Sequence, residues 1–409
     1  MAIPLNRPEI ENVQIKVIEV KNFKSLVDFE IHFPKFSCLI GLNGSGKSTF
    51  LQFIDFMSQL VRGDLKAWFA ERKWKSTDLP SKLTEKDDIE FRIFFCTENG
   101  INVGAWTATY SPTKNHCIHE VFEVLDAVIA VKVENGRVEV YNPLSDPPWQ
   151  KELWKEEIKF NYEGSILSVL KDEFLPPDIL EIKKYLTKIK SLDLLAPEHL
   201  RQRTRESSGT LGRGGSNLAS FIHEMSDSKR EKLLETLKKV YPQLQGLSAK
   251  SLRSGWKQLE IIESFKGQES GLFPKVTTKA RHINDGLLRM IAIFAELDSE
   301  NRFLLIDEIE NGINPELVEF VIDTLVATRQ QVLVTTHSPM ILNYLDDEEA
   351  IEGVIYLYKT AKGHTKSIPF FSIPSLRKKL NVMGPGEAFV DTNLIELAEE
   401  IASMTKEGK

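Results

Sequence analysis

The sequence of 409 residues has few cysteines and no long apolar run. Its three cysteines, Cys38, Cys96 and Cys117, have no CxxC spacing and leave an odd number, which argues against a structural zinc site and against a disulfide framework. No apolar run reaches the length of about 18 residues that a membrane-spanning helix needs. The first residues lack the basic and then apolar pattern of a signal peptide. These absences predict a cytoplasmic protein with no membrane contact.

Acidic residues outnumber basic residues in the whole chain, but not in its middle. The 52 Lys and Arg residues and 59 Asp and Glu residues give a net charge of −7, which argues against a surface coated for nucleic-acid binding. Residues 183–257 nevertheless have a local balance of +9, between segments at −7 and −9. This basic segment either contacts DNA phosphates or forms the exposed faces of ordinary helices. Its candidate phosphate contacts are Lys183, Lys184, Lys188, Lys190, Arg201, Arg203 and Arg205.

Hydrophobic patterns predict three kinds of structure along the chain. Residues 89–141 alternate between apolar and polar and contain two Asn-Gly turns, which predicts an antiparallel meander. Residues 150–245 are mainly helical, with amphipathic helices expected over 178–192 and 227–241. From residue 256 onward, buried strands alternate with helices. This last pattern is typical of a mostly parallel sheet with helices on its faces.

Residues 41–48, GLNGSGKS, fit the phosphate-loop pattern GxxxxGK[ST]. They follow a predicted buried strand (36–40) and precede a helix expected from Lys47, with Phe50, Phe53, Ile54, Met57 and Val61 on its apolar face. Glycines let backbone N–H groups turn toward a phosphate, and the positive end of the helix faces the same anion. Lys47 would reach the β- and γ-phosphates of ATP, and Ser48 would ligate Mg²⁺. The predicted ATP-binding residues are Asn43, Gly44, Ser45, Gly46, Lys47, Ser48 and Thr49.

Two further motifs supply candidate catalytic groups. Asp307 and Glu308 follow the apolar run from Phe303 to Ile306, at the carboxyl end of a predicted strand, where open α/β sheets bind ligands. Asp307 would hold Mg²⁺ through water, and Glu308 would orient or deprotonate the attacking water. His337 ends another strand-like run and would contact the γ-phosphate. Lys47, Glu308 and His337 are therefore the predicted catalytic residues.

The distance between the motifs favours one architecture. Lys47 and Asp307 are 260 residues apart, whereas small kinases, GTPases and ring-forming motors keep the two motifs closer together. We predict an α/β P-loop NTPase of the ABC-ATPase head type, split by an antiparallel β-meander and a helical insertion. Residues 1–150 would form the first half of the head, residues 151–255 a basic helical insertion, and residues 256–409 the second half.

Five segments together resemble the RecF/SMC/OLD-type ABC ATPases, and more narrowly the short AAA family ATPases of that group: NFKSL (22–26), LIGLNGSGKST (39–49), HINDGLLR (282–289), LLIDEIENGINP (304–315) and TTHSPMIL (335–342). The resemblance implies a head-to-head homodimer that sandwiches two ATP molecules. It also implies that Asn284, Asp285 and Gly286 form the signature motif, at the start of a helix that faces the partner's ATP. Residues 310–315 would form the dimer-contacting D-loop.

The same resemblance frames the functional hypotheses. Residues 165–245 are too few for long coiled-coil arms, and the 72 residues after His337 lack an acidic cluster typical of a Toprim nuclease. We predict an ATP-hydrolysing dimeric switch, in anti-phage defence or DNA metabolism, that controls a separately encoded effector such as a nuclease. The alternatives are a DNA repair or chromosome-maintenance ATPase that binds DNA directly, and an ATP-dependent scaffold with very slow turnover. The motif spacing and the lack of an LSGGQ-like motif argue against a transporter subunit.

Overall fold

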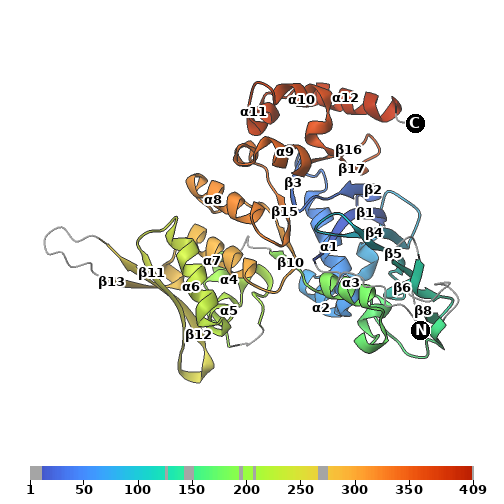
Figure 1. Cartoon of the computed structure of the whole chain (residues 1–409), viewed down its shortest axis with the longest axis horizontal. Helices are drawn as coiled ribbons and strands as arrows, with labels where there is room; N and C mark the ends of the chain where they lie inside the picture. The colour runs from blue at the N-terminus through green and yellow to red at the C-terminus, as the bar shows by residue number, and fades with distance from the viewer. Residues whose placement is uncertain are drawn as a thin grey trace, which may run out of the picture. The chain divides into compact units, whose positions relative to one another are not determined.

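The structure is a computed structural model that describes residues 12–124, 128–141, 152–192, 197–205, 209–265 and 275–407 (Figure 1). The chain forms two compact units, both discontinuous in sequence. Unit 1 contains residues 1–190, 351–377 and 400–409, and unit 2 contains residues 191–350 and 378–399. The predicted insertion over 151–255 is therefore divided between the two units. Its predicted boundary at 150/151 lies outside the described residues.

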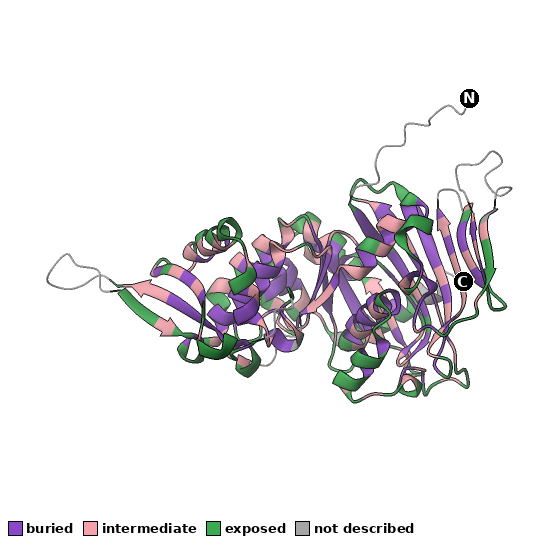
Figure 2. Cartoon of the chain, turned by 90° about the horizontal axis from the view of Figure 1, so that it is seen from below, coloured by how far each residue is buried: buried purple, intermediate pink, exposed green. Residues whose placement is uncertain are grey.

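Unit 1 contains an eight-stranded antiparallel sheet in the order β2-β1-β4-β5-β6-β7-β8-β9. Its strands are β1 (Val13–Phe23), β2 (Leu26–His32), β4 (Ile89–Thr97), β5 (Asn102–Ser111), β6 (His116–Val124), β7 (Val128–Glu134), β8 (Arg137–Tyr141) and β9 (Glu152–Glu157). Strands β4 to β8 confirm the predicted meander. Asn135 and Gly136, both with positive φ, form the turn of the β7–β8 hairpin. Many residues of these strands are buried (Figure 2).

Helix α1 (Lys47–Arg62) packs its apolar face against this sheet. The predicted face residues Phe50 and Phe53 are fully buried. The ring centroid of Phe50 lies 5.2 Å from that of Phe29, and the ring centroid of Phe53 lies 5.2 Å from that of Phe23. Burial of each such side chain stabilises the fold by about 2 kcal/mol. Unit 1 also contains α2 (Leu65–Arg72) and α3 (Pro177–Thr187).

The helix predicted over 178–192 is shorter in the structure. Helix α3 ends at Thr187, and β10 (Ile189–Leu192) begins two residues later. The Arg62 guanidinium donates to the carbonyls of Thr187 (3.0 Å from Nε) and Ile189 (2.8 Å from Nη2). A distant arginine therefore satisfies the carbonyl oxygens at this helix end, an interaction that local periodicity does not contain.

Unit 1 also contains the strands that carry the glycine-rich loop. Strand β3 (Phe36–Ile40) is buried along its whole length and pairs in parallel with β16 (Val354–Lys359). Strand β17 (Thr365–Pro369) pairs antiparallel with β16. The strand before the loop is thus supported by residues more than 300 positions later in the sequence.

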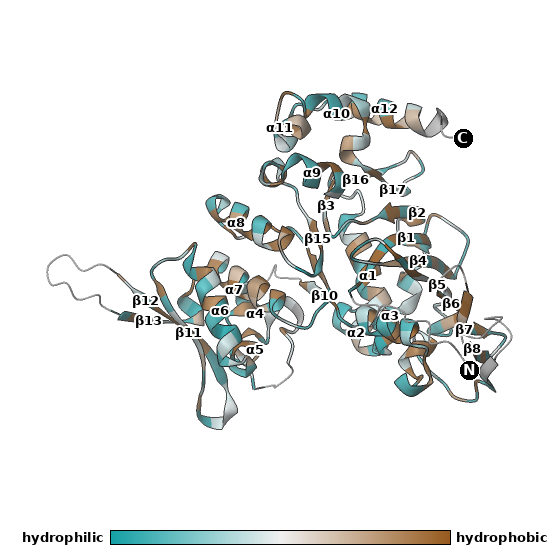
Figure 3. Cartoon of the chain, viewed as in Figure 1, coloured by the Kyte–Doolittle hydropathy of each residue, from teal (hydrophilic) through white to brown (hydrophobic). Residues whose placement is uncertain are grey.

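Unit 2 contains the second α/β segment. Strands β14 (Phe303–Ile306) and β15 (Gln331–Thr335) are parallel, and α7 (Asp285–Leu297) and α8 (Pro315–Val326) confirm the predicted alternation. An antiparallel sheet follows the order β11 (Leu244–Ser251), β12 (Lys257–Ser264) and β13 (Lys275–Lys279). Helix α6 is largely hydrophilic, whereas α7, which packs beside it, is largely hydrophobic and buried (Figure 3). The remaining helices are α4 (Pro197–Leu200), α5 (Leu218–Glu224), α6 (Asp227–Lys238), α9 (Asp347–Gly353), α10 (Pro374–Lys379), α11 (Pro385–Val390) and α12 (Leu394–Glu407).

The structure also describes the three cysteines and shows whether any helix could span a membrane. The three cysteines, all within the described residues, have buried side chains and form no disulfide. Among the described residues, no helix combines the length and the apolar character needed to cross a bilayer.

The basic segment 183–257 is partly neutralised within the fold. Eight of its cations form ion pairs in the described residues: Lys183, Lys184, Arg201, Arg230, Lys232, Lys238, Lys250 and Lys257. Five of the partner carboxylates lie outside the segment: Asp172, Glu181, Glu260, Asp285 and Asp298. The charge of +9 counted along the sequence is therefore reduced in the fold by acidic side chains from other segments.

A buried carboxyl group in the meander makes stability depend on pH. Burial raises the pKa of Glu120 from 4.5 to about 7, although Trp106 Nε1 (3.2 Å) and the N–H of Ile166 (2.7 Å) donate to it. Between these values the folded state holds the Glu120 proton more tightly than the unfolded state, so the contribution of Glu120 to stability is greatest below pH 4.5 and is lost as pH rises toward 7. The expected loss is on the order of 3 kcal/mol. Glu120→Gln should remove this part of the slope in thermal melts from pH 5 to 7, whereas Glu90→Gln, at a partly exposed carboxylate, should retain it.

Candidate functional site

The glycine-rich loop between β3 and α1 has a backbone that only glycine can adopt at two positions. Gly41 and Gly46 have φ values of +145° and +116°. A Cβ at Gly41 would lie 2.3 Å from the carbonyl oxygen of Leu357, and a Cβ at Gly46 would lie 2.5 Å from Thr365 Oγ1. Both approaches are shorter than any van der Waals contact, so these glycines allow β16 and β17 to pack directly against the loop.

The inside of the loop is suited to an anion. Helix α1 has no acidic residue in its first turn and no side-chain cap, so the positive end of the helix faces the loop. Lys47 is buried, and its Nζ donates to the carbonyl of Gly41 at 2.7 Å. The buried hydroxyl of Ser45 has no hydrogen-bond partner among the described residues. An open cradle of N–H groups, a lysine and an unpaired hydroxyl fits a phosphate group.

Thr365 at the start of β17 supports the loop, and sequence analysis missed it. Its hydroxyl is fully buried and lies 2.8 Å from both the Ser45 carbonyl oxygen and Ser25 Oγ. Its N–H donates to the carbonyl of Ser25 at 2.9 Å. No sequence signal marks a residue 320 positions after Ser45 as part of a phosphate loop.

Thr365→Val is expected to weaken ATP binding about three- to tenfold, because it removes a hydrogen bond worth about 1 kcal/mol while preserving the side-chain shape. Calorimetric titration with ATP would measure this. Thr324→Val is a matched control, since Thr324 Oγ1 also donates to a carbonyl, that of Phe320 at 2.7 Å, on α8. Equal affinities of both variants and wild type would contradict a supporting role for Thr365.

In unit 2, one threonine fixes the two adjacent carboxylates. Strands β14 and β15 pair Ile306 with Val334, which places Thr335 beside Asp307. Thr335 Oγ1 donates to Asp307 Oδ1 at 2.5 Å and accepts from the N–H of Glu308 at 2.9 Å. The register of two short parallel strands therefore sets the positions of both carboxylates.

Glu308 has a strained backbone. Its φ of +48° is in the left-handed region, which is unusual for a residue other than glycine. The buried Arg289 of α7 donates from Nη2 to the Glu308 carbonyl at 3.1 Å. Asn311 Nδ2 lies 3.3 Å from Glu308 Oε2. The surroundings hold this carboxylate in a conformation that costs on the order of 1–3 kcal/mol.

His337 lies next to Glu308. The ring Nε2 of His337 is 3.7 Å from Glu308 Oε1, and the backbone N–H of His337 donates to Glu310 Oε1 at 2.8 Å. The side chains of His337 and Glu308 are 40% and 37% exposed. The structure thus brings together three of the predicted residues, Asp307, Glu308 and His337, at the ends of β14 and β15.

The predicted signature residues begin α7. Asn284 caps this helix, with its Oδ1 accepting from the N–H of Leu287 at 2.8 Å. A Cβ on Gly286 would lie 2.9 Å from the Gly312 carbonyl oxygen, so glycine allows the helix to approach the 310–315 loop. The side chain of Asp285 stays partly exposed and pairs with Arg201, which also donates to the carbonyl of Ile283 at 2.9 Å. Arg201, predicted as a phosphate contact for DNA, instead supports the start of this helix.

The predicted site residues form two groups, one in each unit. Unit 1 holds Asn43, Gly44, Ser45, Gly46, Lys47, Ser48 and Thr49, and unit 2 holds Asn284, Asp285, Gly286, Asp307, Glu308 and His337. The supporting residues Thr365, Thr335 and Arg289 were not predicted. Thr335 and Arg289 lie within motif segments of the sequence. Their supporting roles become visible only from the strand pairing and burial in the structure.

A sequence model described as an AAA ATPase domain matches residues 14–342, which include both groups of residues. The chain belongs to the AAA ATPase domain family. No curated protein matches the sequence.

Three solved SMC head structures are similar to this AAA ATPase. The SMC head bound to the C-terminal winged-helix domain of ScpA is 16% identical, with a TM-score of 0.53, over 90% of this chain and 99% of that one. The SMC head domain from Thermotoga maritima is 13% identical, with a TM-score of 0.46, over 87% and 98%. A Pyrococcus furiosus SMC head bound to the C-terminal domain of ScpA is 16% identical, with a TM-score of 0.48, over 90% and 100%. The first of these establishes the predicted P-loop NTPase fold of the ABC-ATPase head type.

Proposed function

We propose that this AAA ATPase binds ATP with Mg²⁺ and hydrolyses it as a dimeric switch for a separately encoded effector. The observation that carries this proposal is the arrangement around Glu308, whose strained backbone is held by Thr335 and Arg289 and whose carboxylate lies 3.7 Å from His337 Nε2. A carboxylate held in this way beside a partly exposed histidine suits the activation of a water molecule. The phosphate-binding cradle of residues 41–48 supplies the substrate site.

Each residue of the site has a separate task in this proposal. Lys47 and the N–H groups of the loop bind the phosphates, and Ser48 and Asp307 hold Mg²⁺. The metal ion, when bound, polarises the γ-phosphate and neutralises its developing charge. Glu308 orients the attacking water and accepts its proton. His337 contacts the γ-phosphate, and Thr335 keeps the two carboxylates in register.

The signature residues provide the reason for a dimer. Asn284, which caps α7, is itself exposed, and a helix N-terminus attracts phosphate. We propose that Asn284, Asp285 and Gly286 of one copy face ATP bound by the other copy. An SMC head of the same fold binds a separate protein, ScpA, in its solved structure. By analogy, the partner of this chain would be an effector protein such as a nuclease, in anti-phage defence or DNA metabolism.

Light scattering with ATP, with ADP and without nucleotide tests the switch. ATP with Mg²⁺ should double the mass of the wild-type chain, and ADP should not. Lys47→Ala should remain monomeric in all three conditions, because it lacks the phosphate contact. A mass that is the same with ATP and with ADP would contradict the proposal.

Arg201→Ala is expected to reduce ATP-dependent dimer formation about tenfold while leaving ATP binding to the monomer unchanged. The reason is that Arg201 holds Ile283 and Asp285 at the start of the signature helix, where a charge-assisted hydrogen bond contributes about 1.5–3 kcal/mol. The dimer dissociation constant from sedimentation equilibrium measures the effect. Exposed Arg203→Ala is the control and should dimerise like wild type.

Direct DNA binding by residues 183–257 has less support than the switch. Half of the sixteen cations counted in this segment are used in ion pairs, and Arg205 stacks on Trp256 at 4.9 Å. Charge reversal at Arg203 tests this alternative without disturbing α7. If the segment binds DNA, duplex affinity should decrease in this variant and should fall steeply with salt in wild type.

A further inference from the structure

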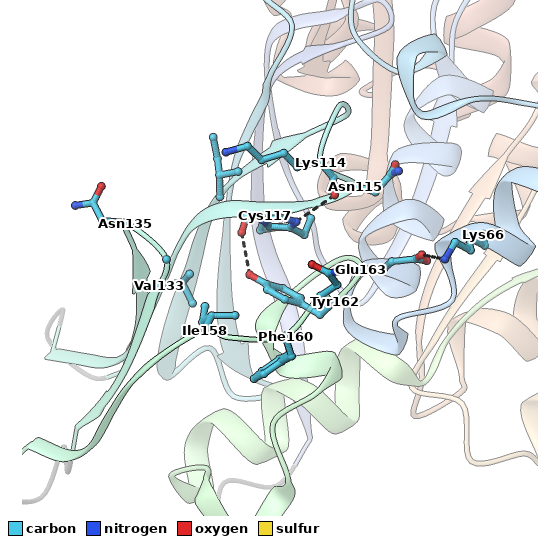
Figure 4. A pocket seen from close by; sticks show the side chains of 14 residues that line it. Lys66, Lys114, Asn115, Cys117, Val133, Asn135, Ile158, Phe160, Tyr162 and Glu163 are labelled. Carbon is cyan, nitrogen blue, oxygen red and sulfur yellow. Dashed lines mark hydrogen bonds and ion pairs between the residues drawn. The ribbon is translucent and has the colours of Figure 1, made fainter.

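An open cavity of about 930 Å³ lies in unit 1, on the β-meander (Figure 4). Its walls are residues 114–118 at the start of β6, residues 133, 135 and 136 around the β7–β8 turn, and the segment 158–163 after β9, with Lys66 of α2. None of the residues 41–49 lines it. Its size is within the range of small-molecule sites, about 300–1,000 Å³. The proposed ATPase function does not use this cavity.

One wall of the cavity is a cluster of three aromatic rings. The rings of Phe160 and Tyr162 lie 6.2 Å apart and are tilted by 59°, and the buried Tyr162 ring lies 4.8 Å from that of His116. Phe160 is 51% exposed, which leaves a face of a large aromatic ring available for stacking. Burial lowers the pKa of His116, so its ring is uncharged at neutral pH. An exposed ring face such as that of Phe160 binds flat, aromatic ligands.

The polar residues of the lining favour a ligand that carries negative charge. Among the lining residues that the structure describes, Glu163 is the one acid, and Lys66 Nζ neutralises it at 2.5 Å. Lys114 is exposed and has no acidic side chain within 4 Å in the described part of the chain. Three side-chain amides add hydrogen-bond donors and acceptors: Asn115, Asn135 and Asn161.

The floor of the cavity is fixed by backbone hydrogen bonds. The N–H of Cys117 donates to the Gly164 carbonyl, and the N–H of Gly164 donates to the Asn115 carbonyl, both at 2.9 Å. The Tyr162 hydroxyl donates to the Cys117 carbonyl at 3.2 Å (Figure 4). Gly164 packs against the last turn of α1. A Cβ added at this position would lie 2.2 Å from the carbonyl oxygen of Leu60. A cavity formed in this way is preorganised, which reduces the entropic cost of binding.

We propose that this cavity binds a nucleotide unit, an aromatic base joined to a phosphate, at a site separate from the phosphate loop. The base stacks on Phe160, and the asparagine amides contact its polar edge. The phosphate pairs with Lys114. This chemistry is shared by a free mononucleotide and by a single strand of nucleic acid, so the test separates these two sources.

The experiment uses the full-length chain with Lys47→Ala as the background, because this change disables the phosphate loop without adding a nucleotide that would compete for the cavity. AMP is titrated by calorimetry, and a fluorescent single-stranded deoxyadenosine hexamer by anisotropy. Phe160→Ala should weaken binding about fivefold or more, because it removes a stacking partner. Lys114→Ala should weaken binding several-fold and make its salt dependence shallower. Phe174→Ala and Lys171→Ala, both exposed and outside the cavity, are the controls and should match wild type.

Binding of AMP that Phe160→Ala weakens would support the site and identify a free nucleotide as its ligand. Binding of the hexamer alone, weakened by the same variant, would support the site and identify a single strand. The proposal is overturned if neither probe binds, or if Phe160→Ala and Phe174→Ala bind both probes like wild type. Phe160 is half exposed, so its variant should melt within a few degrees of wild type, which separates a loss of binding from a loss of folding.

Discussion

Replacing Glu308 by Gln is expected to reduce ATP turnover about a hundredfold or more while leaving ATP binding intact. Glutamine preserves the shape of the side chain but cannot accept the proton of the attacking water. The bonds from Thr335 and Arg289 involve the Glu308 backbone, so the variant should keep the same local structure. Single-turnover hydrolysis measures the chemical step, and light scattering should show an accumulated ATP-bound dimer.

The matched control for this variant is Glu316→Gln, an exposed carboxylate in the first turn of α8. It should hydrolyse ATP at the wild-type rate. Hydrolysis by Glu308→Gln at the wild-type rate would remove Glu308 from the catalytic step. Negligible single-turnover hydrolysis by wild type itself would favour an ATP-dependent scaffold over a switch.

Gly46→Ala is expected to weaken ATP binding about a hundredfold or more and to destabilise unit 1. The new Cβ would lie 2.5 Å from Thr365 Oγ1 and 2.8 Å from its Cγ2, on a backbone whose φ of +116° already disfavours a side chain. Thr365 is fully buried, so the contact can be relieved only by moving β17 or the loop. Calorimetric titration with ATP and thermal melts measure the two effects.

Gly44→Ala provides the comparison within the same loop. Gly44 also has a positive φ, of +76°, but a Cβ there meets nothing within 4 Å. This variant should show only the conformational cost of about 1 kcal/mol and bind ATP within about tenfold of wild type. If both variants bind ATP equally well, the packing of Thr365 against Gly46 does not shape the loop.

Much of the fold could be predicted from local patterns in the sequence. The phosphate loop, α1 with its buried aromatic face, the meander and the strands β14 and β15 all have strong short-range signals. Asn284 is similar, because an asparagine just before an apolar helical run is a typical N-cap. The carboxyl end of β14 could be located for the same reason, since four buried apolar residues lead directly to Asp307.

Interactions between distant segments could not be predicted. Thr365 supports a loop 320 residues earlier in the sequence. Arg62, in α1, donates to a carbonyl oxygen at the end of α3. The charge of residues 183–257 was misleading for the same reason, because its neutralising carboxylates lie elsewhere in the sequence. A count along the chain contains no information on which acids pack beside which bases. Only the tertiary fold assigns Arg201 to the start of α7 rather than to a DNA-binding surface.

The central proposal, which comes from the sequence motifs, is that Ser48 and Asp307 hold the same Mg²⁺ ion. The most direct test is a double-mutant cycle on ATP affinity, with and without Mg²⁺, using Ser48→Ala and Asp307→Asn. If both residues hold the same ion, Mg²⁺ should strengthen ATP binding by wild type about tenfold, and each variant should lose most of this gain. The double variant should lose little more than either single variant, with a coupling energy of about 1–2 kcal/mol. Additive losses, or a Mg²⁺ effect that persists in Asp307→Asn, would contradict the claim.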